Sequence, residues 1–314
     1  SLQIIGLGSA TIGSLQLSLY EDDQLVEQTT NDTIAYMFRP SESQEEVVFS
    51  LIANNGEGLS DTTNTMVIVR ADQHINNPRP AATRDGINYV SNSSVRLSLF
   101  APYKEFVYVL GDFNDWSPSA DYLMHKETHG ADSTWFWLEI DDLSPGQEYA
   151  FQYLVDGDLR IADPYSELTL HPEDDPYIPS SIYQDIPAYP YGKTSFSVGV
   201  LQPGADKYNW NVTNYERPKI KDLVIYELLL RDFLSKHSYQ TLIDTLDYLD
   251  RLGVTAIELM PVNEFEGNLS WGYNPAFHIA LDKYYGTQNA FKAFIDAAHS
   301  RGIAVILDVV LNHA

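Results

Sequence analysis

The 314-residue sequence contains no cysteine, which excludes disulfides, thiolate metal sites and cysteine nucleophiles. It also lacks any apolar run of roughly 18 residues, the length that a membrane-spanning helix needs. Basic residues are scarce, because 19 Lys and Arg stand against 44 Asp and Glu and give a formal net charge of −25. Nucleic acid and anionic membrane surfaces are therefore poor candidates as partners.

The start of the chain lacks the charged segment followed by an apolar segment that marks a secretory signal, so we interpret Ser1-Leu2-Gln3 as a start inside a longer protein. The carboxylates form no Asp-x-Asp-x-Asp-Gly loop, and we interpret most of them as a solvated surface. Aromatic residues are abundant, with 21 Tyr, 13 Phe and 5 Trp. They supply core and sheet residues, and flat rings are also used by proteins to hold sugars.

The first part of the chain shows short alternating apolar runs separated by turn-forming residues such as 54–58. The runs cover residues 15–20, 33–38, 47–52 and 65–69. Regularly spaced short strands predict a small immunoglobulin-like β-sandwich over residues 1–76. No residue in this part suggests chemistry, so a spacer role is favoured. The linker that follows is predicted at the proline-containing residues 76–80.

Residues 81–205 are also rich in predicted strands. Val95, Leu97 and Leu99 alternate with polar residues, and Asp156-Gly157 is a strong hairpin-turn signal. We therefore predict a second β-sandwich over this range. The connection from about 165 to 215 is interrupted by Pro172, Pro176, Pro179, Pro187, Pro190 and Pro203. Its polarity is too low for disorder, so an irregular but ordered connection is expected.

Four segments of this second part occur in a recognisable order: Val107–Trp116, Leu143–Gly146, Tyr153–Gly157 and Asp163–Tyr165. Together they resemble a family-48 carbohydrate-binding module. The resemblance implies a β-sandwich of the kind that precedes the catalytic barrel in glycogen-branching and debranching enzymes. It also implies α-glucan as a partner of the module.

The sugar contacts of that family match this chain only in part. A tryptophan at the position of Trp116 supports a sugar ring in glucan-binding members, so Trp116 is the candidate glucan platform. A second tryptophan is replaced here by Leu159, and a lysine by Gln152. The alternative is that Trp116 packs in the core and that the module is a rigid spacer. Trp135 and Trp137 could form another aromatic face, or pack against the sheet.

The apolar periodicity changes after Lys221. Three apolar runs are predicted as strands: a buried strand at Leu223–Leu228, a second strand at Val254–Met260, and the run from Ile303 to Leu311. The last run has the composition of a strand buried on both faces. Between them, residues 239–249 and 291–298 repeat apolar side chains at helical spacing, with Thr287 as a predicted cap and with Gly253 and Gly302 at the ends. Strand, helix, strand, helix and strand in this order predict a parallel sheet.

One connection in this part is unusually long. Residues 261–286 separate the second strand from the second helix, whereas such loops usually have about 2–6 residues. The loop contains Trp271–Pro275, and long loops at the carboxyl ends of barrel strands handle substrates. Asp308, Asn312 and His313 lie at the end of the third strand, which predicts that they reach the same edge of the sheet.

Four segments carry a second resemblance: Val224–Phe233, Ile257–Val262, Trp271–Pro275 and Ala298–His313. In this order they resemble the start of the catalytic barrel of glycoside hydrolase family 13, the α-amylase family. The resemblance implies a TIM-type (β/α)8 barrel, of which residues 216–314 supply the first three strands. The predicted fold class is thus multidomain, with two β-sandwiches followed by an incomplete barrel.

The resemblance also assigns roles to single residues. It implies that Tyr273 stacks on the sugar ring, that His313 hydrogen-bonds the hydroxymethyl oxygen of that sugar, and that Asp308 lies beneath the same subsite. Asn312 matches a position that ligates calcium in many amylases, which makes Ca²⁺ the candidate cofactor. Trp271 is interpreted as a packing residue of the loop.

The catalytic carboxylates of that family lie on its fourth, fifth and seventh strands. The resemblance therefore implies that no catalytic residue is present in this chain and that the nucleophile and the acid/base lie beyond Ala314. We expect the 314-residue polypeptide alone to be inactive, and its uncovered strand edges to cause aggregation.

The expected function is an α-glucan-active retaining glycoside hydrolase of the α-amylase or pullulanase type, which degrades starch or glycogen. One alternative is a glucan-branching transglycosylase, and another is a non-catalytic α-glucan-binding scaffold protein. The composition fits a secreted, periplasmic or cell-surface bacterial protein, with the cytoplasm as the alternative.

Overall fold

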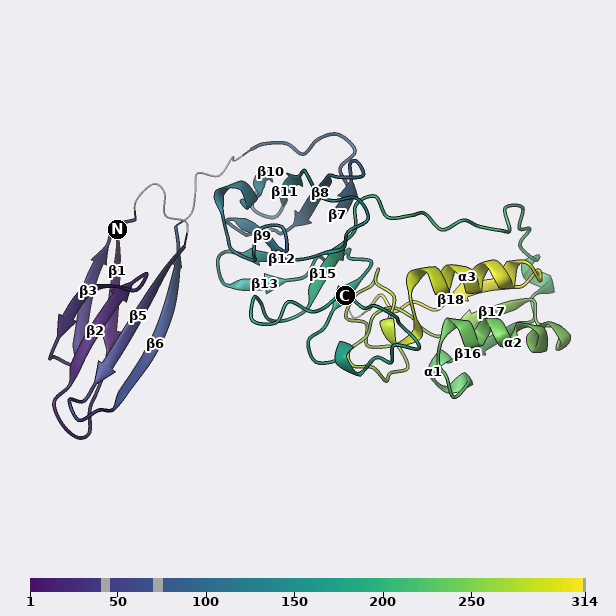
Figure 1. Ribbon diagram of the computed structural model, residues 1–314. Coiled ribbons are helices and arrows are strands. Elements are labelled where there is room, and N and C mark those ends of the chain that lie inside the picture. Colours follow the sequence, from purple (N-terminus) through teal and green to yellow (C-terminus); the bar gives the residue numbers. More distant parts are fainter. Residues whose placement is uncertain (41–45, 70–75, 313–314) are drawn as a thin grey trace.

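The computed structural model describes residues 1–40, 46–69 and 76–312, and the described residues form five sheets. Four of the sheets are antiparallel and come first along the chain, and the last sheet is parallel (Figure 1). All their strands fall inside the predicted limits 1–76, 81–205 and 216–314, and these limits themselves remain predictions. Among the helices of the described part of the chain, none has the length and apolar character needed to cross a membrane.

The N-terminal body is built from two antiparallel sheets. Their strands are β1 (Leu2–Leu7), β2 (Gln16–Glu21), β3 (Gln24–Thr29), β4 (Thr33–Phe38), β5 (Glu46–Asn54) and β6 (Ser60–Ile68). The four-stranded sheet has the order β3-β2-β5-β6, and β1 pairs with β4. Leu17, Phe38 and Phe49 belong to the core of this body. The predicted sandwich is confirmed, although β1 and β3 were missed, because their residues are mostly exposed and show little apolar alternation.

The middle body is a second sandwich. One sheet has the order β10-β11-β8-β7, from β7 (Gly86–Tyr89), β8 (Val95–Phe100), β10 (His125–Thr128) and β11 (Thr134–Ile140). The other contains β9 (Val107–Gly111), β12 (Tyr149–Val155), β13 (Leu159–Ile161), β14 (Thr169–Leu170) and β15 (Val198–Leu201). Every residue of β12 is buried, since this strand pairs with β9, β13 and β15. Asp156 and Gly157 both have positive φ and form the predicted hairpin turn.

The five-stranded sheet of this body has a core on each side. Val107 and Val109 belong to the core shared with the other sheet, whereas the alternate residues Tyr108 and Leu110 belong to a second core. The second core also includes Tyr189 and Val198, together with Leu168 and Ile186 at its margin. The proline-rich connection is therefore ordered, as predicted, and it packs over the outer face of the sheet.

The parallel sheet has the order β16-β17-β18, from β16 (Ile225–Leu228), β17 (Ala256–Leu259) and β18 (Ala304–Leu307). The connections contain the short α1 (Leu230–Phe233) and the longer α2 (Tyr239–Arg251) and α3 (Gln288–His299). Ser238 caps α2, and the Thr287 side chain accepts a hydrogen bond from Ala290 N at the start of α3, as predicted for Thr287. Gly253 and Gly302 follow the two helices with positive φ, which a glycine adopts without strain.

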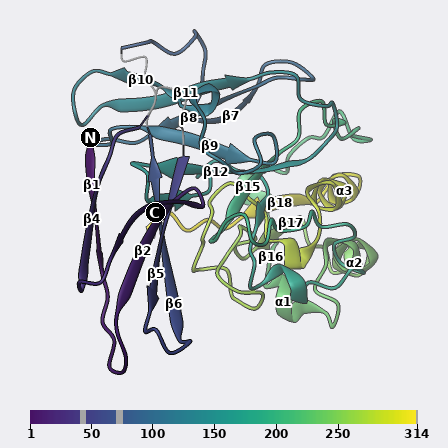
Figure 2. The same ribbon diagram turned by 60° about the vertical axis from the view of Figure 1, so that its left-hand side comes forward.

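The longer helices cover only one face of this sheet (Figures 1 and 2). Leu246 and Phe294 pack with Ile257 and Leu259 in a single core cluster. In the described residues the opposite face is not covered by helices, and Ile225 on it is half exposed. The predictions of a buried strand at β16 and of a strand buried on both faces at β18 are therefore wrong, because cover is present on one side only.

The remaining short elements are 3-10 turns. They are η1 (Ala120–Tyr122), η2 (Asp175–Tyr177), η3 (Ile220–Asp222) and η4 (Lys283–Tyr285). Two of them, η2 and η4, carry charged side chains that are buried between the middle body and the parallel sheet, and these side chains prove important for the site.

Candidate functional site

The carboxyl ends of the three parallel strands form one edge of the sheet. The ladder continues one residue beyond the strands, because Met260 N donates to Leu228 O and Asp308 N donates to Leu259 O, both at 3.0 Å. Side chains that directly follow the strands are thereby held in adjacent positions. The predicted edge is thus present, and Asp308 lies on it.

Tyr273 reaches the same edge from the long loop. Its Oη donates a hydrogen bond to Asp308 Oδ2 at 2.6 Å, across 35 residues of sequence. This bond, together with burial and the negative charges of Asp308, Glu227 and Glu258, raises the pKa of Tyr273 to about 12. The phenol therefore stays protonated at neutral pH, while 39% of the residue remains accessible to solvent.

Glu227 and Glu258 add negative charge near this pair. They are neighbours in the register of β16 and β17, in line with Ile306 on β18. Both carboxylates lie close enough to contribute to the raised pKa of Tyr273. The edge is therefore electronegative, which suits a site at which positive charge develops.

The conformation of the loop 261–286 fixes the position of Tyr273. Gly272 has φ +88°, and a Cβ atom there would lie 2.2 Å from Pro261 O, so only glycine fits. Ser270 Oγ accepts from Gly272 N at 2.9 Å, and Ala276 N donates to Glu264 O at 2.8 Å. The residue before Tyr273 is thereby held against the start of the loop.

The sequence did not correctly predict the roles of two residues of this loop. Trp271 is 57% exposed, so its interpretation as a packing residue is wrong; the turn at Gly272 leaves the indole outside the core. His278 pairs through Nε2 with Val310 O at 3.0 Å and joins the loop to the segment after β18. Both residues belong to the loop that carries Tyr273, and neither was predicted as a site residue.

A buried ionic cluster stabilises the conformation of the loop 261–286. Lys283 is 1% exposed and pairs with Glu264, while Asp175 Oδ1 lies 3.3 Å from Lys283 Nζ. Burial opposes the charge on Lys283, but the Glu264 and Asp175 carboxylates outweigh burial and raise the pKa of the lysine. Burial also raises the pKa of Glu264, to about 7. Lys283 is therefore charged and serves as the cation of the cluster.

His171 completes this cluster as a neutral group. Its Nε2 lies 3.2 Å from Glu264 Oε1, and its Nδ1 pairs with Ser197 Oγ at 2.9 Å. Burial and the charge of Lys283 lower the pKa of His171 to about 3, so the imidazole is neutral and its contact with Glu264 is not an ion pair.

The cluster connects two parts of the chain. His171 and Asp175 follow β14 of the middle body, whereas Glu264 and Lys283 belong to the loop that carries Tyr273. Separating the two parts would remove Asp175, one of the two carboxylates that pair with the buried Lys283, which is costly. The middle body therefore helps to fix the loop, a role that the sequence did not indicate.

A second attachment is made through α3. The Asp296 carboxylate accepts from Asn211 N and Val212 N at 2.8 Å, and from Asn211 Nδ2 at 2.7 Å. These hydrogen bonds, led by that of the Asn211 backbone, lower the pKa of Asp296. The connection between the two bodies is thus bound to the helix that covers the parallel sheet.

The predicted glucan platform Trp116 is not open. Only 6% of the residue is exposed, and the ring belongs to the second core of the middle body with Tyr189 and Val198. Its Nε1 donates to Asp112 Oδ1 at 3.0 Å. Because no ring face is free for a sugar, the structure does not support Trp116 as a platform and favours the packing alternative.

Gln152, at the position of the family's lysine, is buried under the connection. Its Nε2 donates to Ser195 O and Ser197 O, both at 3.0 Å, and its Oε1 accepts from Thr194 Oγ1 at 2.6 Å. Leu159 is largely exposed but carries no hydrogen-bonding group. The chain itself therefore covers this face at Trp116 and Gln152, two of the three positions at which the resemblance placed sugar contacts.

The tryptophan pair of β11 also takes part in packing. Trp137 is buried and donates through Nε1 to Asn77 O at 2.9 Å. The guanidinium carbon of Arg79 lies 4.4 Å from the centre of the Trp135 ring, and Phe100 packs beside that ring. These contacts favour the packing alternative over a separate aromatic face.

Two predicted residues follow β18. Asn312 is exposed, and His313 lies outside the described residues. Among the residues with a described placement, no group of three or more His, Asp or Glu side chains could hold a metal ion. Calcium at Asn312 and the sugar contact of His313 therefore stay predictions.

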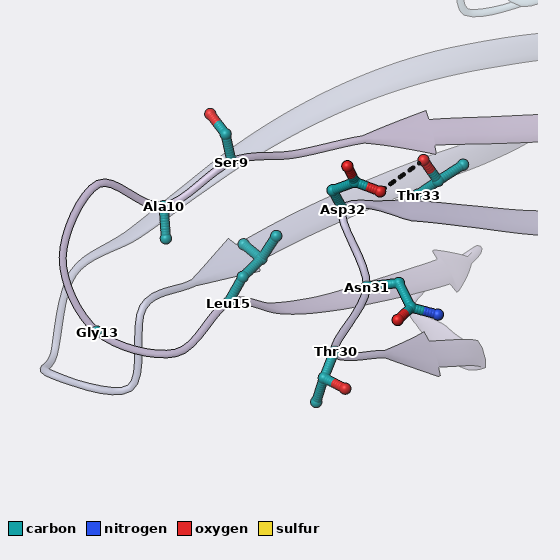
Figure 3. Close-up of a pocket in the computed structure, with 8 residues that line it drawn as sticks. All are labelled: Ser9, Ala10, Gly13, Leu15, Thr30, Asn31, Asp32 and Thr33. Carbon is teal, nitrogen blue, oxygen red and sulfur yellow. Dashed lines mark hydrogen bonds between the residues drawn. The ribbon is translucent and has the colours of Figure 1, made fainter.

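The N-terminal body has a pocket of its own at one end of its strands, with a volume of about 680 Å³ (Figure 3). It is lined by Ser9, Ala10, Gly13, Leu15, Thr30, Asn31, Asp32 and Thr33. Thr33 Oγ1 donates to Asp32 Oδ1 at 3.1 Å, and apart from Leu15 the other lining residues have small or amide side chains. The lining brings together no set of groups with an evident chemical task.

Two parts of the chain match known protein families. Residues 85–166 match the family described as carbohydrate-binding module 48, the isoamylase N-terminal domain. Residues 237–314 match the family described as alpha amylase, catalytic domain. The order of the two matches agrees with the order of the middle body and the parallel sheet.

Curated relatives include enzymes of two kinds. A malto-oligosyltrehalose trehalohydrolase of Saccharolobus solfataricus is 33% identical over 208 residues, which are 64% of this chain and 32% of that protein. A 1,4-alpha-glucan branching enzyme GlgB of Cupriavidus pinatubonensis is 32% identical over 233 residues, which are 70% of this chain and 28% of that protein. The chain thus spans about a third of the length of the curated relatives it matches.

Solved structures share the fold. The GBS pullulanase SAP, in complex with maltotetraose, superposes with a TM-score of 0.51 over 94% of this chain and 41% of its own, at 19% identity. The catalytic module of the pneumococcal virulence factor SpuA gives a TM-score of 0.51 over 72% of this chain and 37% of its own, at 22% identity.

Proposed function

We propose that this chain, which belongs to the α-amylase family and carries a family-48 module followed by the start of the catalytic domain, is part of a retaining glycoside hydrolase that degrades starch or glycogen. The observation that carries the proposal is the Tyr273–Asp308 hydrogen bond at the carboxyl edge of the parallel strands. It brings together two residues to which the resemblance gives neighbouring roles in one sugar subsite.

The geometry at this edge suits a neutral sugar. The accessible ring of Tyr273 offers an apolar face to the C–H groups of a pyranose, while its hydroxyl is held by Asp308. The negative charge of Asp308 favours the positive charge that develops at the anomeric carbon of the transition state. His313 is proposed to bind the hydroxymethyl oxygen of the same sugar.

The chemical step is assigned to residues other than these. Retaining hydrolysis needs a nucleophilic carboxylate and an acid/base about 5–5.5 Å apart. In the α-amylase family the resemblance places them on the fourth, fifth and seventh strands, and the 314 residues supply the first three. We therefore propose that Tyr273 and Asp308 bind and orient the sugar and that they do not cleave it.

The catalytic part of the proposal is tested with the purified 314-residue chain. Release of reducing ends from starch, glycogen and pullulan is expected to stay at the level of a protein-free control. Cleavage by this polypeptide would refute the assignment of the catalytic carboxylates. If its reading frame continues past Ala314, the following codons should encode an aspartate, a glutamate and a later aspartate at successive strand ends.

The binding part is tested by isothermal titration of maltoheptaose into the monomeric fraction of the chain. Tyr273→Ala should weaken binding at the edge about tenfold, because it removes the ring and the donor to Asp308. Tyr103→Ala, which removes an exposed tyrosine of the middle body, is the matched control and should leave affinity unchanged. Equal affinity of Tyr273→Ala and the unaltered chain would contradict the subsite.

Glycosyl transfer by a branching enzyme is the second candidate, because the 32% identity to a GlgB protein extends over 70% of this chain. The discriminating measurement is product analysis with the complete catalytic domain. New α-1,6 branch points in amylose would favour transfer, and free maltooligosaccharides would favour hydrolysis.

A further inference from the structure

A cleft of about 880 Å³ lies between the middle body and the start of the parallel sheet. Its walls come from the turn after β7, from residues near the ends of β12, β14 and β15, and from the amino end of α3. Neither Tyr273 nor Asp308 is among the described residues that line it. The cleft is therefore separate from the edge discussed above.

We propose that this cleft is a second carbohydrate site that binds a short, uncharged α-glucan across the family-48 module and the catalytic domain. The choice of α-glucan rests on the proposed function, whereas the preference for a neutral, hydroxyl-rich ligand rests on the lining itself. The cleft volume falls within the range of about 300–1,000 Å³ that small-ligand sites occupy.

The rim of the cleft carries a fixed aromatic ring. Tyr89 is 51% exposed, and its Oη accepts a hydrogen bond from Gln202 N at 3.1 Å. The bond holds one end of the ring while the exposed remainder is available for contact. Leu168, Val90 and Leu281 add apolar surface to the lining. A held ring beside apolar surface is suited to the C–H face of a sugar.

A second phenol lines the cleft at Tyr183. Burial and the nearby Glu148 carboxylate raise the pKa of Tyr183 to about 12. The hydroxyl is therefore neutral at physiological pH and can both donate and accept a hydrogen bond. Sugar hydroxyls need partners of this kind.

Amide side chains supply further hydrogen-bonding groups. Gln288 Nε2 donates to Glu167 Oε2 at 2.9 Å and so joins α3 to the middle body across the cleft. Asn92, Gln184 and Asn289 also line it, and in the described residues their side chains make no hydrogen bond with the protein. They retain both donors and acceptors for a ligand.

The charge of the lining argues against an anionic ligand. Four carboxylates line the cleft, Glu148, Glu167, Asp185 and Asp206, against the two ammonium groups of Lys207 and Lys292. An excess of negative charge repels phosphates and nucleotides. Neutral saccharides carry no charge and are not affected.

Unlike the covered face of the module, the cleft has accessible aromatic and amide side chains. Trp116 and Gln152 are engaged inside the middle body, whereas Tyr89 and Asn92 of the same body remain accessible. Because both bodies line the cleft, a bound glucan would contact both.

The test is titration of maltoheptaose into the monomeric 314-residue chain and its variants. The unaltered chain should show two binding steps. Tyr89→Ala should weaken one step at least tenfold and leave the step that depends on Tyr273 unchanged. Asn289→Ala, on the exposed surface of α3, should weaken the same step about threefold. This variant tests the cleft even if Tyr89→Ala fails to fold. Inorganic phosphate should not bind.

The outcomes separate this proposal from the proposed function. If Tyr89→Ala and Asn289→Ala both bind like the unaltered chain while Tyr273→Ala loses binding, the cleft is overturned and the edge subsite stands. If the two cleft variants lose a step that Tyr273→Ala retains, the cleft stands independently of the edge. If phosphate competes with maltoheptaose, the neutral-ligand site is overturned.

Discussion

The covered face of the family-48 module and the open edge of the parallel sheet each combine an aromatic and a polar side chain. The aromatic ring is buried on the module and accessible at the edge. On the module, the ring of Trp116 is buried and every polar atom of Gln152 is bonded to its own chain. At the edge, the ring of Tyr273 is accessible, and a single bond to Asp308 orients it. An aromatic residue beside a polar one is thus insufficient for a sugar site, because the ring must also be free.

The difference arises from the segments that follow each sheet. The proline-rich connection returns over the outer face of the five-stranded sheet, and its residues Ile186 and Tyr189 pack in the same core as Trp116. The loop 261–286 instead makes a turn at Gly272 and is stabilised by the ion pair of Lys283 with Glu264. A long, irregular segment therefore covers the outer face of the module sheet, whereas another long, irregular segment forms part of the site at the edge of the parallel sheet.

The largest expected effect is on the free energy of unfolding, and it is expected at the buried ring of the module. Trp116→Ala should lower the free energy of unfolding by about 3–5 kcal/mol, because it removes a large ring from a packed core. Trp271→Ala, at the exposed edge, is the matched control and should change it by about 0.5 kcal/mol or less. Urea unfolding followed by circular dichroism measures both. A similar loss in the two variants would show that Trp271 is packed as firmly as Trp116.

A smaller effect is expected from the pH dependence of the cluster under the loop. Burial raises the folded-state pKa of Glu264 from 4.5 to about 7, so the folded protein binds this proton more tightly than the unfolded chain. The contribution of Glu264 is therefore full below about pH 4.5 and is lost as the pH rises through about 7.

The measurement is the free energy of unfolding of the unaltered chain and of Glu264→Gln between pH 4.5 and 8. Glu264→Gln cannot ionise, so the decline across this window should be flatter in the variant. Parallel pH profiles of the two proteins would show that another group titrates there.

The smallest effect on stability is expected at the edge itself. Tyr273→Phe removes only the hydroxyl from an accessible residue and should change the free energy of unfolding by about 0.5 kcal/mol or less. The loss of the bond to Asp308 frees the ring, so the affinity for maltoheptaose should fall about threefold. Thermal unfolding and isothermal titration of the same sample give both values. A large loss of stability without loss of affinity would make Tyr273 a structural residue.

Local features of the sequence predicted much of the parallel part. Thr287 and the positive-φ glycines Gly253 and Gly302 act within a few residues of the helix ends, so their effect can be predicted from short segments. The common direction of parallel strands placed Asp308 at the carboxyl edge, whereas only the family resemblance placed Tyr273 in the same subsite.

The sequence could not predict the features that depend on distant partners. Lys283 follows Asp282, and its own charge gives no local sign of burial; its partner Asp175 is far away in the sequence. The covering of Trp116 likewise depends on Tyr189 and Val198, which return to it only in the folded chain. Such contacts between remote segments have no local sequence pattern.

The most direct test of the account is hydrogen exchange of the monomeric chain, measured by mass spectrometry with and without maltoheptaose. The sugar is expected to slow exchange of peptides containing residues 270–275 and 306–312, and to leave residues 112–118 and 191–197 unchanged. Slower exchange in the module peptides, with no change around Tyr273 and Asp308, would contradict the claim that the open edge rather than the covered module face binds the glucan.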